Sequence, residues 1–236
     1  MIDLHTHILP GFDDGVRSLE QARDLARAAE AEGISVLAAT PHVRDDYPTS
    51  PERMERGVQA LRADFAEAGI GVEIVCGGEV AIERLWDLSD EDVRRFTYHG
   101  AGRYLLVEFP YYDWPPLLEP TLLQLRASGI RPLLAHPERN DAVQADPSRL
   151  GPVVLEGALV QLTAGSLSGS FGAPPRTAAL GLLELGLAHV LATDAHGPHV
   201  AGRGGLASAA RVVSDPALAK RLTTEVPAAI LAGEDV

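Results

Sequence analysis

Segments with strand character alternate with segments with helix character along all 236 residues of this chain. Apolar runs predict seven strands, at residues 2–8, 35–40, 72–76, 104–109, 131–135, 158–163 and 188–193. Capping residues and apolar stripes predict helices between them, at residues 19–32, 51–68, 89–96, 117–128, 147–156, 177–185 and 206–213, with short helices in the tail.

This alternation predicts one α/β domain that spans residues 1–236. Strands and helices in this order favour a parallel sheet, most simply a closed seven-stranded barrel. A doubly wound open sheet remains the alternative, although the run from Gly11 to Gly15 lacks the glycine spacing of a dinucleotide-binding fingerprint. We see no repeat, linker or low-complexity segment that would divide the chain.

The first fifteen residues, MIDLHTHILPGFDDG, combine side chains that bind metals. His5 and His7 stand two positions apart in a strand-like run, so both imidazoles point to one face. Asp13 and Asp14 follow in a turn, from which a carboxylate can reach back. Two imidazoles and a carboxylate at a strand end predict part of a metal site. The alternative is a strand that ends in polar residues without binding an ion.

Residues of the same types recur at the ends of the other predicted strands. They are His42, Glu79, Glu108, His136, Asp194 and His196. In a parallel barrel these ends open on one face, which is the face that carries active sites. Carboxylates mixed with imidazoles suit manganese, iron, cobalt or zinc, and nine candidates predict more than one ion. Other interpretations stay open, because Glu108 could pair with an arginine and Asp194 could cap a helix.

Charge and rare residues narrow the classes of function. The chain has 33 Asp and Glu against 20 Lys and Arg, and its net charge of −13 disfavours general nucleic-acid binding. The single cysteine, Cys76, excludes an intramolecular disulfide and predicts a reducing compartment. The single lysine, Lys220, lies too late in the sequence for a Walker A loop or a barrel Schiff base. Without a signal peptide or a long apolar run, we expect a cytoplasmic protein that does not insert into membranes.

Seven short motifs stand in a fixed order: LHTH, PGFDDG, ATPH, GGE, VEFP, AHPER and TDAH. Together they resemble the PHP (polymerase and histidinol phosphatase) superfamily. More narrowly, they are similar to the bacterial metal-dependent protein-tyrosine phosphatases of capsule and exopolysaccharide systems. The similarity runs from Ile2 to about Arg203. The resemblance implies a distorted seven-stranded (β/α)7 TIM-like barrel with a trinuclear metal centre. We expect three divalent ions there, with manganese as the first candidate and iron, cobalt or zinc as the others.

The resemblance also implies a role for each motif residue. His5, His7, Glu79 and Asp194 would hold one ion; Glu79 would bridge to a second ion held by Glu108 and His136; Asp14, His42 and His196 would hold a third. Arg139, in the HPER motif, would bind the substrate phosphate. Arg203 lies where the family has a second arginine, although the residues around it depart from the family pattern. The role of Asp13 stays open, and we interpret the remaining histidines, His99, His189 and His199, as structural.

The reaction implied by the resemblance is phosphotyrosine hydrolysis by metal-activated hydroxide. A phenolate leaving group has a pKa of about 10, so no general acid is required. The expected partner is a phosphotyrosine protein, a bacterial tyrosine kinase of polysaccharide synthesis. The alternatives are a phosphatase for a small phosphoester such as histidinol phosphate, and a non-catalytic regulatory barrel. Cys76 is not predicted to be a nucleophile, because Ile82 stands where cysteine-based phosphatases need an arginine.

Overall fold

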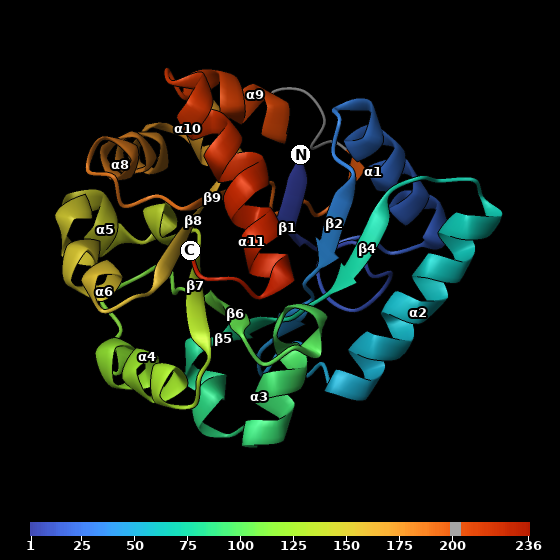
Figure 1. The fold of residues 1–236 in the computed structure, drawn as a ribbon, viewed down its shortest axis with the longest axis horizontal. Helices are drawn as coiled ribbons and strands as arrows, with labels where there is room; N and C mark the ends of the chain where they lie inside the picture. Colours follow the sequence, from blue (N-terminus) through green and yellow to red (C-terminus); the bar gives the residue numbers. More distant parts are fainter. Residues whose placement is uncertain (199–203) are drawn as a thin grey trace.

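The computed structural model describes residues 1–198 and 204–236 and shows an α/β fold with two parallel sheets (Figure 1). The first sheet has the order β1 (Ile2–Thr6), β2 (Val36–Ala39), β4 (Glu73–Cys76). The second has the order β3 (His42–Val43), β5 (Glu79–Ala81), β6 (Tyr104–Glu108), β7 (Arg131–Ala135), β8 (Leu159–Thr163), β9 (Val190–Ala192). The predicted α/β class with parallel strands is therefore confirmed.

The two sheets are joined at three places. The chain crosses from β2 to β3 through Thr40 and Pro41, and from β4 to β5 through Gly77 and Gly78. An isolated parallel bridge joins Thr6, at the end of β1, to Ala195, just after β9. The sequence predicted seven strands, whereas the described residues contain nine strand segments. The two additional ones, β3 and β5, have only two and three residues, which is too short for an apolar period to reveal.

Most of the predicted helices are present with small shifts. They are α1 (Leu19–Ala31), α2 (Pro51–Glu67), α3 (Asp90–Phe96), α4 (Leu118–Ala127), α8 (Ala173–Glu184) and α9 (Leu206–Val212). Ser18 and Ser50 cap α1 and α2 by accepting the N–H groups of Gln21 and Arg53. Helix α8 starts four residues earlier than predicted, because prolines in a first helical turn lose no hydrogen bond.

Shorter helical segments fill the connections. The segment predicted as one helix at 147–156 is a 3₁₀ turn, η4 (Pro147–Leu150), followed by α6 (Gly151–Leu155). Others are η1 (Ile82–Trp86), η2 (Tyr98–Gly100), η3 (Pro137–Arg139), α5 (Asp141–Ala145), α7 (Ala164–Ser168), α10 (Pro216–Lys220), η6 (Arg221–Glu225) and α11 (Val226–Ala232). Among the described residues, none of the helices has the length and apolarity needed to cross a bilayer.

The strands occupy the centre of the molecule and the larger helices lie around them (Figure 1). One apolar cluster fills the space between strands and outer helices. A second cluster lies inside and takes a side chain from each of seven strands: Leu4, Ala38, Val75, Leu106, Leu133, Leu159 and Val190. Helix α11 covers this inner cluster with Val226 and Ile230. Seven of the strands therefore contribute to one shared packed cluster.

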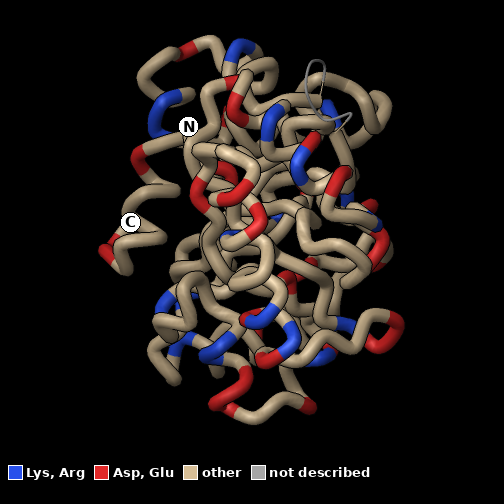
Figure 2. The backbone as a smooth tube through the Cα atoms, turned by 90° about the vertical axis from the view of Figure 1, so that its right-hand side faces the viewer, with Lys and Arg blue, Asp and Glu red and all other residues tan. Residues whose placement is uncertain are grey.

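Charged residues are mixed over the surface. On the side of the molecule that carries α1 and α2, acidic and basic positions intersperse along the backbone (Figure 2). Asp and Glu outnumber Lys and Arg in the chain, which gives the net charge of −13.

Candidate metal centre

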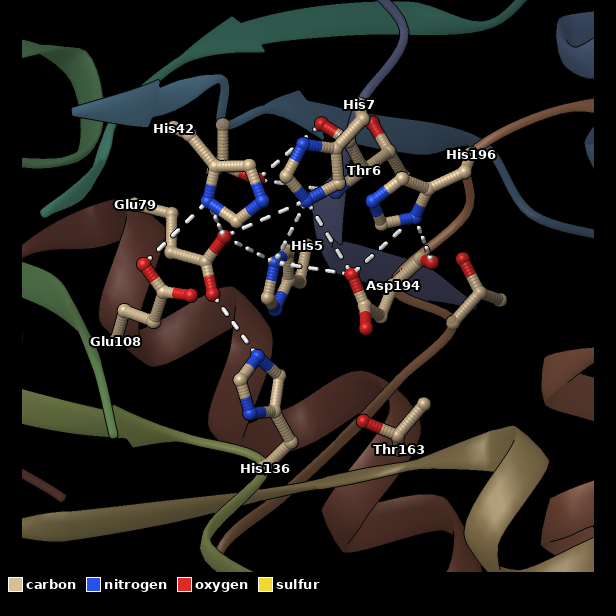
Figure 3. Close-up of polar contacts among 12 residues, drawn as sticks. His5, Thr6, His7, His42, Glu79, Glu108, His136, Thr163, Asp194 and His196 are labelled. Carbon is tan, nitrogen blue, oxygen red and sulfur yellow. Dashed lines mark hydrogen bonds and ion pairs between the residues drawn. The ribbon is translucent and has the colours of Figure 1, made fainter. Parts of the chain in front are cut away.

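The nine candidate ligands meet at the carboxyl ends of the strands (Figure 3). They come from β1 and the turn after it, from the starts of β3 and β5, and from the ends of β6, β7 and β9. Seven of them are buried, whereas Asp14 is exposed and His196 is half-buried. The sequence therefore identified the residues that the fold brings together, and their role as ligands remains a proposal.

Four ligand atoms form a compact group at the bottom of the centre. His5 Nε2 and His7 Nε2 lie 3.2 Å apart. Both lie 3.2–3.4 Å from Glu79 Oε2 and from Asp194 Oδ1. A tetrahedral ion with ligands at roughly 2.1 Å keeps its ligand atoms about 3.4 Å apart. The spacing of His5, His7 and Asp194 therefore fits one metal ion, and Glu79 Oε2 lies against the two imidazoles of that group.

Glu79 faces two further imidazoles with its two oxygens. Its Oε1 lies 2.9 Å from His136 Nε2, and its Oε2 lies 2.8 Å from His42 Nδ1. His42 Nδ1 also lies 3.5 Å from Glu108 Oε2. Within the described residues, these buried atoms of His42 and Glu108 and the Oε2 of Glu79 make no hydrogen bond of good geometry. Buried polar atoms without partners are costly, and a bound cation would satisfy them.

A third group lies nearer to solvent. It contains His7, Asp14, His42 and His196, whose ligand atoms lie within 4.8 Å of one another. Asp14 Oδ1 is 3.5 Å from His42 Nε2 and 3.4 Å from His196 Nε2. The groups differ in detail from the sets implied by the resemblance. His7 also joins this group, while His136 lies with His5 and Glu79, and Glu108 lies with His42 and Glu79.

Two ligand candidates have left-handed backbone conformations. His136 has φ 40° and ψ 45°, and Asp194 has φ 55°. His136 directly follows β7, and Asp194 lies two residues after the end of β9. Such conformations cost about 1–3 kcal/mol each and persist where the surrounding fold holds them. Here backbone bonds hold them, from the His136 N–H to the Gln161 carbonyl and from the Asp194 N–H to the His5 carbonyl. The strained turns aim both side chains into the centre.

Other side chains orient the imidazoles. Asp13 Oδ2 accepts hydrogen bonds from His7 Nδ1 at 2.8 Å and from the His42 N–H at 2.9 Å. This contact gives Asp13 the orienting role that the sequence left open. Gln161 Oε1 lies 2.9 Å from His5 Nδ1. Our sequence analysis missed Gln161, although an amide in the apolar run LVQLT was a usable signal. Such partners fix the ring nitrogen that faces an ion.

The buried imidazoles and carboxylates shift one another's ionisation. Burial lowers the pKa of His42, but the carboxylates of Glu79 and Glu108 raise it to about 10. Burial raises the pKa of Glu79, but the charges of His5 and His42 hold it well below its usual range. The buried carboxylates therefore stay ionised against positive charge on the imidazoles. A metal ion can supply that positive charge instead, because its binding displaces protons from histidine ligands.

Arg139 lies at the edge of the centre. Its guanidinium donates a hydrogen bond to Asp194 Oδ2 at 2.9 Å and lies between the rings of Tyr111 at 4.5 Å and Phe171 at 4.6 Å. The other carboxyl oxygen of Asp194 faces His5 and His7. Phe171 was missed, because nothing in its local sequence suggests a contact with Arg139. Arg203 and His199 lie outside the described residues.

The open interpretations of other residues are resolved by their contacts. Glu108 does pair with an arginine, since its Oε1 accepts a hydrogen bond from Arg44 at 2.8 Å, while its Oε2 faces His42. His189 lies away from the centre, where its Nδ1 accepts the Val160 N–H, and burial lowers its pKa to about 4. Burial also raises the pKa of Cys76 to about 11. A thiol in that state is a poor nucleophile at neutral pH.

Comparisons with known proteins agree with this geometry. A family model described as "Capsular polysaccharide synthesis, CpsB/CapC" matches residues 1–231. Tyrosine-protein phosphatase YwqE of Bacillus subtilis is 35% identical over 199 residues, which cover 83% of this chain and 77% of the relative. Tyrosine-protein phosphatase CpsB of Streptococcus pneumoniae is 27% identical over 204 residues, covering 83% of each chain.

A solved structure gives the same result. It comes from work on YwqE and CpsB, described there as unique metal-dependent tyrosine phosphatases. It superposes on this chain with a TM-score of 0.84 and 31% sequence identity, and the alignment covers 100% of this chain and 96% of the other.

Proposed function

Because this chain belongs to the CpsB/CapC family of capsular polysaccharide synthesis, we propose that it is a metal-dependent protein-tyrosine phosphatase. The similar proteins YwqE and CpsB carry that activity in their names, and the similar solved structure is described as metal-dependent. The observation that carries the proposal is the convergence of nine metal-ligand side chains at one end of the strands. The reaction is the hydrolysis of the phosphomonoester bond of phosphotyrosine.

We propose that these nine residues hold three divalent ions and that manganese is the natural metal. The spacing of His5, His7 and Asp194 supports one ion position, and the contacts of Glu79 with His5, His42 and His136 support a second ion next to it. His42, Asp14 and His196 supply the third. When bound, the ions provide water that is deprotonated near neutral pH and positive charge for the phosphoryl oxygens.

The chain's own residues bind and orient the ester. Within the described residues, Arg139 has one recorded hydrogen bond, to Asp194, and its planar group can bind two phosphate oxygens at once. The rings on both sides of the guanidinium limit its rotation. The bond that breaks joins phosphorus to the tyrosine oxygen. The phenolate needs little help to leave, since its conjugate acid has a pKa of about 10.

Three finer points belong to the same proposal. We propose that residues 1–236 form one domain and that the two sheets close into a distorted seven-stranded barrel, in which β2 with β3 and β4 with β5 each count as one strand. The inner cluster, with side chains from seven strands, supports the barrel. We propose a bacterial tyrosine kinase of polysaccharide synthesis as substrate, because the family is defined by that process. The cytoplasmic location stays a prediction.

Phosphate release from a panel of substrates tests the function. The manganese-loaded protein should hydrolyse phosphotyrosine peptides faster than phosphoserine peptides and histidinol phosphate. Glu79→Gln should abolish the activity, because it removes a charge shared by two ligand groups. Glu73→Gln is the matched control, since Glu73 is an exposed carboxylate on β4. A preference for histidinol phosphate would instead favour a small-molecule phosphatase, and hydrolysis of none of these substrates would favour a regulatory protein.

A further inference from the structure

Two cavities adjoin each other beside the metal centre. The first, of about 340 Å³, has several charged side chains in its lining, among them Arg44 and the candidate ligand Glu108. The second, of about 440 Å³, lies farther out. The two share Glu83 and Pro110 as lining residues. Because Pro110 follows Glu108 by two positions, their Cα atoms lie at most about 7 Å apart. The outer cavity therefore lies next to the cavity that Glu108 lines.

The outer cavity is strongly apolar. We call it the aromatic groove, and its apolar lining includes Ile82, Trp86, Tyr112, Trp114, Pro115 and Leu117. Several of these side chains remain open to solvent, with exposed fractions of 77% for Tyr112, 53% for Leu117 and 50% for Trp86. Large apolar side chains gathered around one groove beside an active site are typical of a binding surface.

The wall of the groove is fixed to the segment that carries Arg139. Asn140 donates hydrogen bonds from Nδ2 to the carbonyls of Pro110 and Asp113, both at 2.8 Å. Asp141 Oδ1 accepts the Asp113 N–H at 2.9 Å. On the opposite wall, Trp86 Nε1 donates to Thr121 Oγ1 at 3.1 Å. These bonds fix the position of the groove relative to Arg139, the proposed phosphate-binding residue. A groove that is already formed loses less conformational entropy when a peptide binds.

Two carboxylates at the groove have no recorded ion pair among the described residues, and the cation recorded at its lining, Arg149, lies over the Trp114 ring at 4.6 Å. Within residues 1–198 and 204–236, neither the Glu83 nor the Asp113 side chain makes an ion pair or hydrogen bond that the structure records. The neighbouring Arg84 is occupied by Asp45 and Asp87. The groove thus combines an apolar lining with two carboxylates that have no recorded partner. This combination is complementary to a peptide in which an apolar side chain stands next to a basic one.

We propose that the aromatic groove binds the polypeptide that flanks the phosphotyrosine, taking one aliphatic or aromatic side chain with a lysine or arginine next to it. This inference rests on the proposed phosphatase function. An extended peptide advances about 3.3 Å per residue, so the bound side chain lies two to four positions from the phosphotyrosine. The groove makes the enzyme selective for sequence around the phosphotyrosine.

Peptide kinetics on the manganese-loaded protein give the first test. Phosphotyrosine peptides carrying Leu-Lys at two to four positions on either side are compared with peptides carrying Ser-Ser or Asp-Asp there. We expect kcat/KM to be about ten- to a hundredfold higher for one Leu-Lys peptide, the effect of burying one large apolar side chain. 4-Nitrophenyl phosphate, which cannot reach the groove, measures the basal activity.

Tryptophan fluorescence gives a second readout that does not need turnover. Trp86 and Trp114 are the only two tryptophans of the chain, and both line the groove. A Leu-Lys peptide with a non-hydrolysable phosphonate in place of the phosphate should shift their emission on binding, whereas the Asp-Asp version should not. Both peptides carry the same phosphonate, so the difference between them reports the groove alone.

Variants locate the effect. Tyr112→Ser and Leu117→Ser should remove the preference for the Leu-Lys peptide and leave hydrolysis of 4-nitrophenyl phosphate unchanged. Glu83→Gln should lower the preference for Leu-Lys over Leu-Ser. Leu155→Ser is the matched control, because Leu155 is 89% exposed on α6, outside the groove.

The outcomes separate the two proposals. Equal kcat/KM for all phosphotyrosine peptides, with normal basal activity, overturns the groove inference and leaves the phosphatase function standing. Absence of hydrolysis for every substrate overturns the function. If Tyr112→Ser converts an oligomer into a monomer in sedimentation, and peptide selectivity is absent, the groove is an interface between copies of this chain and the inference is wrong.

Discussion

The site has a buried floor and an open rim, and the two are built differently. The floor consists of the candidate ligands with their orienting partners Asp13 and Gln161, and its central side chains are fully buried with at least two polar contacts each. The rim consists of Arg139, its ring partners and the aromatic groove, and it is held mainly by ring faces and backbone bonds. In the function we propose, the floor holds the metal ions and the rim binds the substrate.

Metal removal affects the floor most strongly. We expect chelation to lower phosphotyrosine hydrolysis by about a thousandfold or more, because several kcal/mol of charge stabilisation disappears. Re-addition of manganese should restore the rate, and metal analysis of the purified protein should find more than one ion per chain. Full activity in a thoroughly demetallated sample would contradict the proposed chemistry.

His136→Ala should have the next largest effect. The change removes a ligand that faces Glu79, so we expect metal affinity to fall by more than about a hundredfold, beyond what loss of an orienting partner costs. Metal stoichiometry measured beside the rate provides the check. His189→Ala is the control, since that histidine lies outside the centre. An unchanged metal content would remove His136 from the ligand set.

Arg139→Ala should separate the rim from the floor. We expect the rate to fall about a hundredfold, which corresponds to about 3 kcal/mol, while all ions stay bound. Arg139→Lys should recover only part of the rate, because an ammonium offers no paired donors. The measurement again combines kinetics with metal analysis. Loss of metal, or a wild-type rate, would show that Arg139 supports Asp194 instead of binding phosphate.

Gln161→Leu should weaken metal binding indirectly, through His5. The variant removes the acceptor for His5 Nδ1, so we expect metal affinity to fall by roughly tenfold while the fold is kept. Titration of the stripped protein with manganese measures the change. Gln161→Glu keeps an oxygen acceptor and should bind metal more tightly than Gln161→Leu. Equal affinities for both variants would mean that the contact has no orienting effect.

Cys76→Ser should have the smallest effect. Burial raises the pKa of Cys76 to about 11, so the thiol carries its proton at neutral pH, and the reactive thiolate appears only as the pH approaches that value. Cys76 also lies on β4, outside the floor. We expect activity within about twofold of wild type. A loss of several orders of magnitude in a folded variant would reopen the question of a cysteine nucleophile.

The sequence predicted the floor better than the rim for a physical reason. Floor residues occupy fixed positions at strand ends, so spacing along the chain predicts convergence in space, as His7, Glu108 and Asp194 show. Rim contacts join segments whose positions are set by loops. Phe171 reaches Arg139 only because Gly165 leaves room for its ring, since a Cβ there would lie 2.7 Å from the ring of Phe171. No local pattern encodes such a meeting.

The fold shows the same division. Capping residues and apolar stripes predicted the larger helices, and apolar runs predicted the longer strands. The short strands β3 and β5 did not, because their residues serve the site instead of an apolar period. His42 opens β3 and Glu79 opens β5. The ligand groups in the structure also differ from the sets that the resemblance implied. Side-chain directions decide which imidazole faces which carboxylate, and spacing along the sequence does not give these directions.

The two crossings between the sheets have a mechanical consequence. Each crossing has only two residues, Thr40 with Pro41 and Gly77 with Gly78. We therefore expect that neither sheet can shift or unfold while the other keeps its register. A displacement of β2 reaches β3, and so His42, across only three peptide bonds. The bridge from Thr6 to Ala195 joins the first strand to the segment after the last one in the same way. We expect the sheets to lose their hydrogen-exchange protection together, as one cooperative unit that has no internal hinge.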